Sequence, residues 1–99
     1  MDLAAWSVGT DRGANMYYTY VIESVARPDK KYIGYTSDLK QRLMVHNQGK
    51  CKYTAKFRPW RVRAYFAFLE IGIAKKFERY LKSGSGHSFS NRHFWPAKQ

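Results

Sequence analysis

Carboxylates are scarce in this sequence. Its 99 residues include seven Asp and Glu against 18 Lys and Arg, which gives a formal net charge of +11. A two-metal nuclease needs several carboxylates around one centre, and after Asp38 only Glu70 and Glu78 remain. The scarcity therefore argues against a two-metal site. A one-metal site with a single protein carboxylate and bound water stays feasible, because Mg²⁺ keeps much of its hydration shell.

Cysteine is almost absent, and motifs for zinc and for nucleotide phosphates are missing. Cys51 is the single cysteine, so it cannot form an internal disulfide and is interpreted as an ordinary residue. A reducing, cytoplasmic setting is expected. His87 and His93 have no partners at metal-ligand spacing, which argues against a zinc site. No glycine-rich loop ends in Lys-Ser or Lys-Thr, which argues against a nucleotide hydrolase.

Long apolar runs are also missing. No stretch approaches the eighteen apolar residues that a membrane-spanning helix requires, so no membrane association is expected. The first residues lack a basic segment followed by an apolar one, and we therefore expect no secretory signal.

Positive charge and aromatic residues, by contrast, are abundant. A charge of +11 attracts polyanions, so nucleic acid is the leading partner, ahead of an anionic membrane surface. Cations and aromatics alternate between residues 50 and 63: Lys50, Lys52, Lys56, Arg58, Arg61 and Arg63 are interleaved with Tyr53, Phe57 and Trp60. Such a segment suits phosphate binding and base stacking. It equally suits a solvated loop whose aromatic side chains enter the core.

The hydrophobic pattern predicts an α/β domain. Aromatic and β-branched residues predict strands over 17–24, 31–36 and 61–68, with the first two joined as a hairpin. Helices are predicted over 38–47, 71–82 and 88–93. In the second helix four residues recur at helical spacing and should be buried: Ile73, Ala74, Phe77 and Leu81. Residues 50–59 are predicted to form a basic loop. Residues 83–86 are predicted to end the second helix and separate it from the third.

The ends of the chain carry no such pattern. Residues 1–15 show neither helical nor strand periodicity and are predicted to be a disordered tail. Residues 16–94 form the predicted domain, and 95–99 are assigned to a C-terminal tail. The domain should be a small three-stranded sheet with helices packed on it.

Three polar residues of the predicted helices could carry chemistry. Arg42 and His46 are four residues apart and share a helix face, where arginine can hold a phosphate and histidine can move a proton. The alternative is a solvated face beside the basic segment. Glu78 lies in the middle of the second helix, where it could bind a metal ion or simply pair with Lys82 four residues later.

Taken together these residues resemble the GIY-YIG nuclease family. Tyr32-Ile33-Gly34 matches the second half-motif, with Arg42 ten residues and His46 fourteen residues after Tyr32, and Glu78 on the second long helix. The first half-motif stands as Tyr18-Thr19-Tyr20 and keeps only its final tyrosine. The segment 81–86 is similar to the small single-domain bacterial subgroup related to the nuclease domain of the excision-repair protein UvrC. The resemblance covers roughly residues 16–89.

The resemblance implies a three-stranded antiparallel sheet and hydrolysis of DNA with one Mg²⁺ or Mn²⁺. It implies that Glu78 binds the metal, that Tyr32 acts as general base and that Arg42 neutralises the phosphate. Tyr20 would position this network, and His46 would assist proton transfer. The residues expected to bind nucleic acid are Lys50, Lys52, Lys56, Arg58, Arg61 and Lys82.

Three functions remain open at this point. The first is a structure-selective endonuclease of DNA repair or recombination that acts on branched or nicked DNA, alone, as an oligomer or with a protein partner. The second is a nucleic-acid-binding module with the same fold and little or no catalysis. The third is an RNA-binding or ribosome-associated basic protein, which charge alone permits.

Overall fold

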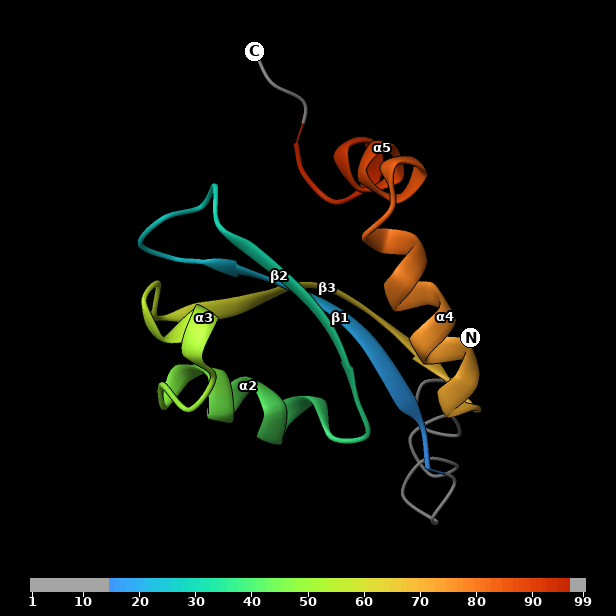
Figure 1. Cartoon of the computed structure of the whole chain (residues 1–99), viewed down its shortest axis with the longest axis horizontal. Helices are drawn as coiled ribbons and strands as arrows, with labels where there is room; N and C mark the ends of the chain where they lie inside the picture. Colours follow the sequence, from blue (N-terminus) through green and yellow to red (C-terminus); the bar gives the residue numbers. More distant parts are fainter. Residues whose placement is uncertain (1–14, 97–99) are drawn as a thin grey trace.

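A three-stranded antiparallel sheet divides the molecule into two layers of helices (Figure 1). The computed structural model describes residues 15–96, so the predicted tail over 1–15 lies almost wholly outside the described residues. The elements in chain order are β1 Tyr17–Ser24, β2 Lys31–Thr36, α2 Leu39–Asn47, α3 Lys52–Ala55, β3 Trp60–Phe68, α4 Ile71–Leu81 and α5 Gly84–His93. The predicted α/β class and sheet are therefore confirmed.

Strand β1 is the centre of the fold. It pairs antiparallel with β2 on one side and with β3 on the other, so the order is β2-β1-β3. Figure 1 shows α2 and α3 on one face of the sheet and α4 and α5 on the other. Because successive side chains alternate between faces, Tyr20 points to α2, while the neighbouring Thr19 donates from its Oγ1 to the carbonyl of Ala74 in α4 at 2.7 Å. Burial on both faces explains why β1 is nearly all buried.

Local sequence signals place helix α2. Asp38 caps its first turn, with Oδ1 accepting from the backbone N–H of Gln41 at 3.0 Å. Gly49 follows the last turn with a φ of 80°, a left-handed conformation that glycine adopts without a steric cost. The predicted start and end of this helix are confirmed.

Two predicted segments contain more helix than expected. Inside the predicted loop 50–59 the chain forms the short helix α3. The predicted break at 83–86 does separate two helices, because α4 ends at Leu81, but α5 begins at Gly84 and not at the predicted residue 88, with Ser83 Oγ accepting from the N–H of Gly86 at 3.2 Å. A Cβ built on Gly86 would lie 1.9 Å from the carbonyl oxygen of Tyr80. The glycine therefore allows close packing of α5 on the end of α4, which local propensity does not reveal.

Helix α4 packs across the sheet with one face only. Ala74 and Leu81 are fully buried, and the Phe77 ring meets the ring of Phe66 at 4.7 Å. Ile73, predicted to be buried, is 44% exposed because it lies beside the contact face and points to solvent. None of the helices in residues 15–96 combines the length and apolar character needed to cross a membrane.

A buried carboxylate ties the end of the described chain to the sheet. Glu23 is 2% exposed and accepts from Arg61 Nε at 2.8 Å and from Trp95 Nε1 at 3.0 Å, with Arg63 at 3.7 Å. Burial alone would raise the pKa of this carboxyl, but the hydrogen bonds from Trp95 and Arg61 and the nearby cations outweigh it and lower the pKa. Trp95, assigned to the C-terminal tail by its sequence, is thus held against β1, and Lys31 lies over its ring at 4.6 Å.

Candidate active site

Four of the predicted site residues meet on the α2–α3 face of the sheet. Tyr20 Oη lies 3.0 Å from His46 Nε2, and Arg42 Nε donates to the same hydroxyl at 3.4 Å. The ring of Tyr32, from the neighbouring strand β2, lies 4.9 Å from the His46 ring and 6.4 Å from the Tyr20 ring. Residues separated by up to 26 positions in the chain therefore form one polar cluster.

The glycine of the second half-motif makes room for this cluster. Gly34 pairs directly with Tyr20 across the two strands. A Cβ built on Gly34 would lie 2.5 Å from Tyr20 Oη, so any other residue would push the tyrosine ring away from its partners.

Burial separates the cluster into two pairs. Tyr20 is 1% exposed and His46 is completely buried. Burial raises the pKa of Tyr20, with the Arg42 hydrogen bond acting in the opposite sense. Burial also lowers the pKa of His46, and the charge of Arg42 adds to this effect. Both buried groups are therefore neutral at neutral pH, whereas Tyr32 and Arg42 are only half-buried and can face a substrate.

A groove of about 550 Å³ opens beside Tyr32 and passes over the edge of the sheet. It is lined by Val21, Asp29, Lys30, Lys31, Tyr32, Ile33, Tyr53, Leu81, Lys82, His87, Ser90, Asn91 and Trp95. The groove thus joins the polar cluster on one face to the junction of α4 and α5 on the other. Its cationic rim suits a phosphate backbone.

Glu78, in α4, is not part of the groove lining but pairs with a residue that is. Its Oε2 accepts from Lys82 Nζ at 2.6 Å, and Lys82 lines the groove. The ion pair that the sequence offered as an alternative is therefore present. Within residues 15–96, no three side chains of His, Cys, Asp or Glu converge to hold a metal. A lone carboxylate oxygen still fits Mg²⁺, because water and phosphate oxygens can fill the remaining positions.

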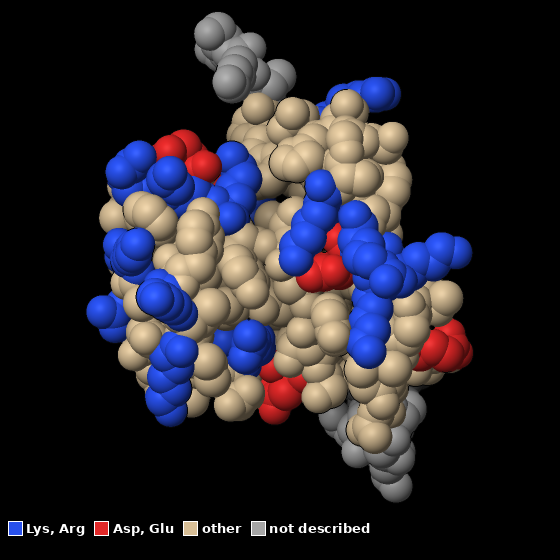
Figure 2. Space-filling model, in the orientation of Figure 1, with Lys and Arg blue, Asp and Glu red and all other residues tan. Residues whose placement is uncertain are grey.

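Four of the six predicted nucleic-acid-binding residues lie together on and around α3, whereas Lys82 lies at the end of α4. Lys50, Lys52, Lys56 and Arg58 are exposed on and around α3, and Figure 2 shows basic side chains along this side and a second group over α4. Arg61 is engaged with Glu23.

The aromatic residues of the basic segment have different roles. Trp60 is 3% exposed and donates from Nε1 to the carbonyl of Thr54 at 2.7 Å, so it belongs to the core and cannot stack on a base. Tyr53 is 46% exposed and stacks on Tyr32 with 6.1 Å between ring centroids. The interpretation that aromatic side chains of this segment enter the core is thus confirmed for Trp60, whereas base stacking by Tyr53 stays a prediction.

Sequence reasoning missed three residues of the site. Lys30 and Lys31 line the groove beside Tyr32, and their position in the hairpin next to the half-motif was a usable signal. Thr54 lies 2.8 Å from His46 Nδ1 through its Oγ1. Nothing in the sequence around Thr54 marks it, because it meets His46 only after α3 has folded.

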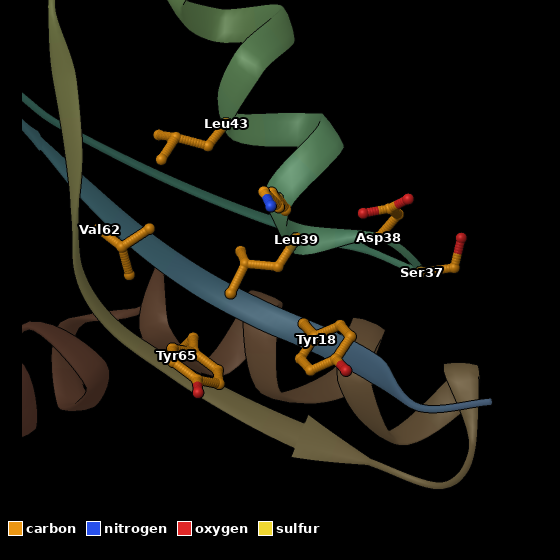
Figure 3. Close-up of a pocket in the computed structure, with 8 residues that line it drawn as sticks. Tyr18, Ser37, Asp38, Leu39, Leu43, Val62 and Tyr65 are labelled. Atoms are coloured by element: carbon orange, nitrogen blue, oxygen red, sulfur yellow. The ribbon is translucent and has the colours of Figure 1, made fainter. Parts of the chain in front are cut away.

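A second cavity lies on the same face but apart from the cluster (Figure 3). It has a volume of about 430 Å³ and is lined by Tyr18, Ser37, Asp38, Leu39, Lys40, Leu43, Val62 and Tyr65. Tyr18 replaces the glycine of the first half-motif, and its ring packs edge-on against Tyr65 at 6.0 Å. Tyr18 therefore lines this second cavity and does not enter the Tyr20 cluster.

The fold and the cluster define a small α/β domain in which a polar cluster of Tyr20, Arg42 and His46 lies beside Tyr32, which lines a basic groove. Residues 16–92 match the model of the family described as the GIY-YIG catalytic domain. The chain therefore belongs to the GIY-YIG family, an endonuclease family, and the resemblance noted from its sequence is confirmed.

Several bacterial relatives share parts of this chain. A UPF0213 protein of Streptococcus pneumoniae is 53% identical over 38 residues, which cover 37% of this chain and 36% of the relative. A UPF0213 protein of Streptococcus pyogenes is 49% identical over 60 residues, covering 60% of this chain and 59% of the relative. The chain thus matches less than two thirds of each of these relatives. The solution NMR structure of a UPF0213 protein from Bacillus halodurans covers 82% of this chain and 88% of its own, with 29% identity and a TM-score of 0.49.

Proposed function

We propose that this protein is a metal-dependent endonuclease that hydrolyses phosphodiester bonds in DNA, with branched or nicked DNA of repair or recombination as its substrate. The observation that carries the proposal is the cluster of Tyr20, Arg42 and His46 beside Tyr32 at the basic groove. A reducing, cytoplasmic setting agrees with the free Cys51.

The residues have distinct roles in this proposal. Tyr32 is half-buried at the groove and acts as general base on the attacking water. Arg42 neutralises the phosphate through the guanidinium N–H groups that Tyr20 leaves free. His46 is completely buried, so it acts through its hydrogen bond to Tyr20 and does not touch the substrate.

Glu78 supplies the protein ligand for Mg²⁺ or Mn²⁺. A bound divalent cation contributes charge neutralisation at the scissile phosphate. Lys82 Nζ donates to Oε2 of this carboxylate, so a cation would bind through Oε1 or take the place of the Lys82 ammonium. Lys82 lines the groove, so a DNA phosphate is an alternative partner for its charge.

The altered first half-motif is compatible with catalysis. Tyr18 packs on Tyr65, and Thr19 points to the opposite face, where it bonds Ala74. Neither side chain alters the position of the Tyr20 hydroxyl beside His46 and Arg42. This geometry favours an enzyme over a module that binds DNA without cutting it.

The proposal is tested by incubating the protein with branched, nicked and linear DNA, with Mg²⁺ or Mn²⁺ and with chelator. We expect cleavage that requires the metal and is lost in Glu78→Gln, while DNA binding persists. Glu70→Gln is the matched control, because Glu70 is the other carboxylate of the α4 region and is exposed at its N-cap. DNA binding without cleavage under every metal condition would instead support the binding module.

A further inference from the structure

Thr54 holds the side of His46 that faces away from Tyr20. It lies in α3 and is completely buried. Its Oγ1 is 2.8 Å from His46 Nδ1, and the same hydroxyl donates to the carbonyl of Cys51 at 3.3 Å. The Thr54 carbonyl accepts from Trp60 Nε1 at 2.7 Å, which fixes the residue against the core.

The direction of each hydrogen bond follows from the number of protons available. A hydroxyl can donate only one hydrogen bond, and Thr54 donates it to the Cys51 carbonyl. The Thr54 oxygen can then only accept from His46, so the proton of the neutral imidazole lies on Nδ1. Nε2 is left as an acceptor, and Tyr20 must donate to it.

The chain of bonds ends at the arginine. Arg42 Nε can only donate, and it meets the Tyr20 hydroxyl at 3.4 Å. Because the Tyr20 hydroxyl donates its hydrogen bond to His46 Nε2, its oxygen lone pairs are free to accept a hydrogen bond from Arg42. Every bond from Arg42 through Tyr20 and His46 to Thr54 therefore runs in one direction, and all the donors have acceptors.

We propose that Thr54 is a positioning residue that fixes the Nδ1–H tautomer of His46 and, through Tyr20, the orientation of the Arg42 guanidinium. With the other tautomer, Nε2 would donate to Tyr20 and the tyrosine proton would turn towards Arg42 Nε, placing two donors against each other. Arg42 would then lose its anchor. The catalytic consequence rests on the nuclease function proposed above, whereas the tautomer itself does not.

The direct test is the ¹⁵N NMR spectrum of the histidine imidazoles in the unaltered protein, with His46 assigned by His46→Gln. We expect a protonated Nδ1 and an unprotonated Nε2. Thr54→Val keeps the shape and removes the hydroxyl, so the wild-type tautomer should be lost. Cleavage should fall by about 10- to 100-fold, the range seen when groups that orient an active-site imidazole are removed. Thr54→Ser should restore both the tautomer and the rate.

Thr19→Val is the matched control, because Thr19 is also a completely buried threonine whose hydroxyl bonds a backbone carbonyl, on the opposite face of the sheet. It should leave the His46 tautomer unchanged. An Nε2–H tautomer in the unaltered protein, or an unchanged His46 spectrum in Thr54→Val, would overturn the proposal. The spectrum of the unaltered protein decides the tautomer even if Thr54→Val does not fold. Absence of DNA cleavage with the expected tautomer would refute the nuclease function and leave the hydrogen-bond assignment standing.

Discussion

Tyr32 differs from its neighbour Tyr20 in one physical respect, which is access. Tyr20 is buried and bonds the buried His46 and the half-buried Arg42, whereas Tyr32 is half-buried and lines the groove. A general base must reach the proton that it removes. In the proposed mechanism Tyr32 is therefore the tyrosine that acts on water, and Tyr20 holds Arg42.

Replacing Tyr32 by phenylalanine should separate catalysis from binding. The change removes only a hydroxyl and should cost about 1 kcal/mol of stability or less. Loss of a positioned general base should slow cleavage by about 10²- to 10⁴-fold. DNA affinity should hardly change, because the lysine and arginine contacts to phosphate remain. Cleavage rate, affinity and melting temperature should all be measured on the same variant.

Tyr35→Phe provides the comparison for this measurement. Tyr35 lies three residues along the same strand and is exposed, with its ring under the ammonium of Lys75 from α4. The same atom is removed on the opposite face of the sheet, so cleavage should stay at the wild-type rate. Equal rates for both variants would remove Tyr32 from the proposed mechanism.

At the scale of elements, α3 has two functions. Its inner side carries Thr54 to His46, and its outer side carries exposed basic residues. Because each neutralised phosphate releases counterions, DNA affinity should fall steeply with salt. Changing Lys52, Lys56 and Arg58 together to alanine should reduce the slope of log K against log salt by about 2 to 3 units.

Removing the same number of positive charges from α4 tests whether DNA contacts α3 directly or only responds to the overall charge of the protein. Lys75, Lys76 and Arg79 are also exposed, on the other face of the sheet. If α3 contacts the backbone of the DNA, their replacement by alanine should change the slope less than replacement of the α3 residues. Equal slopes for the two triple variants would place the contact surface elsewhere.

The α4–α5 junction depends on one glycine. Gly86→Ala would bring a Cβ to 1.9 Å from the Tyr80 carbonyl oxygen, so one of the two helices has to move. We expect a loss of about 1–3 kcal/mol in the free energy of unfolding, as for other overpacked sites. Gly84→Ala, in the same turn but with nothing within 4 Å of its Cβ, should cause no such loss. Urea denaturation of the two variants checks this, and equal midpoints would contradict the close packing.

At the scale of the whole molecule, two buried groups make stability depend on pH. Burial and the charge of Arg42 lower the pKa of His46 in the folded protein below the ordinary histidine pKa of about 6.5. Below that pH the unfolded chain therefore binds more protons than the folded one, and stability decreases as the pH is lowered, by at most about 1.4 kcal/mol per pH unit. The pKa of Glu23 is also lowered, so its contribution is present above about pH 4.3 and is lost as pH falls further.

Urea midpoints measured between pH 7 and pH 3 should thus decline in two stages. His46→Gln should flatten the first stage, which begins as the pH falls below about 6.5, and leave the second. The high net charge of the chain also opposes folding in acid by self-repulsion, but this effect does not depend on His46. An unchanged first stage in the variant would therefore show that His46 is not the titrating group.

The sequence by itself determined the strands, the helix from Asp38 and the family. These depend on short-range rules: alternation over 17–24, a cap three residues before Gln41, and motif spacing around Tyr32. Over 83–86 the same rules predicted the end of α4 but not the start of α5 at Gly84, because Gly86 serves as a point of close contact between the two helices. The prediction that Ile73 is buried failed for a related reason. Helical spacing predicts an apolar stripe on the helix but not how much of that stripe the sheet covers.

Only the tertiary structure decided how the site works. The burial of His46 and its contact with Thr54 join groups that lie on separate elements. Spacing brings residue types to the same region, but hydrogen-bond direction, burial and ion pairing depend on which atoms lie within about 3 Å after folding. Those distances are set by the packing of α2 and α3 on one face and of α4 on the other, which no local segment encodes.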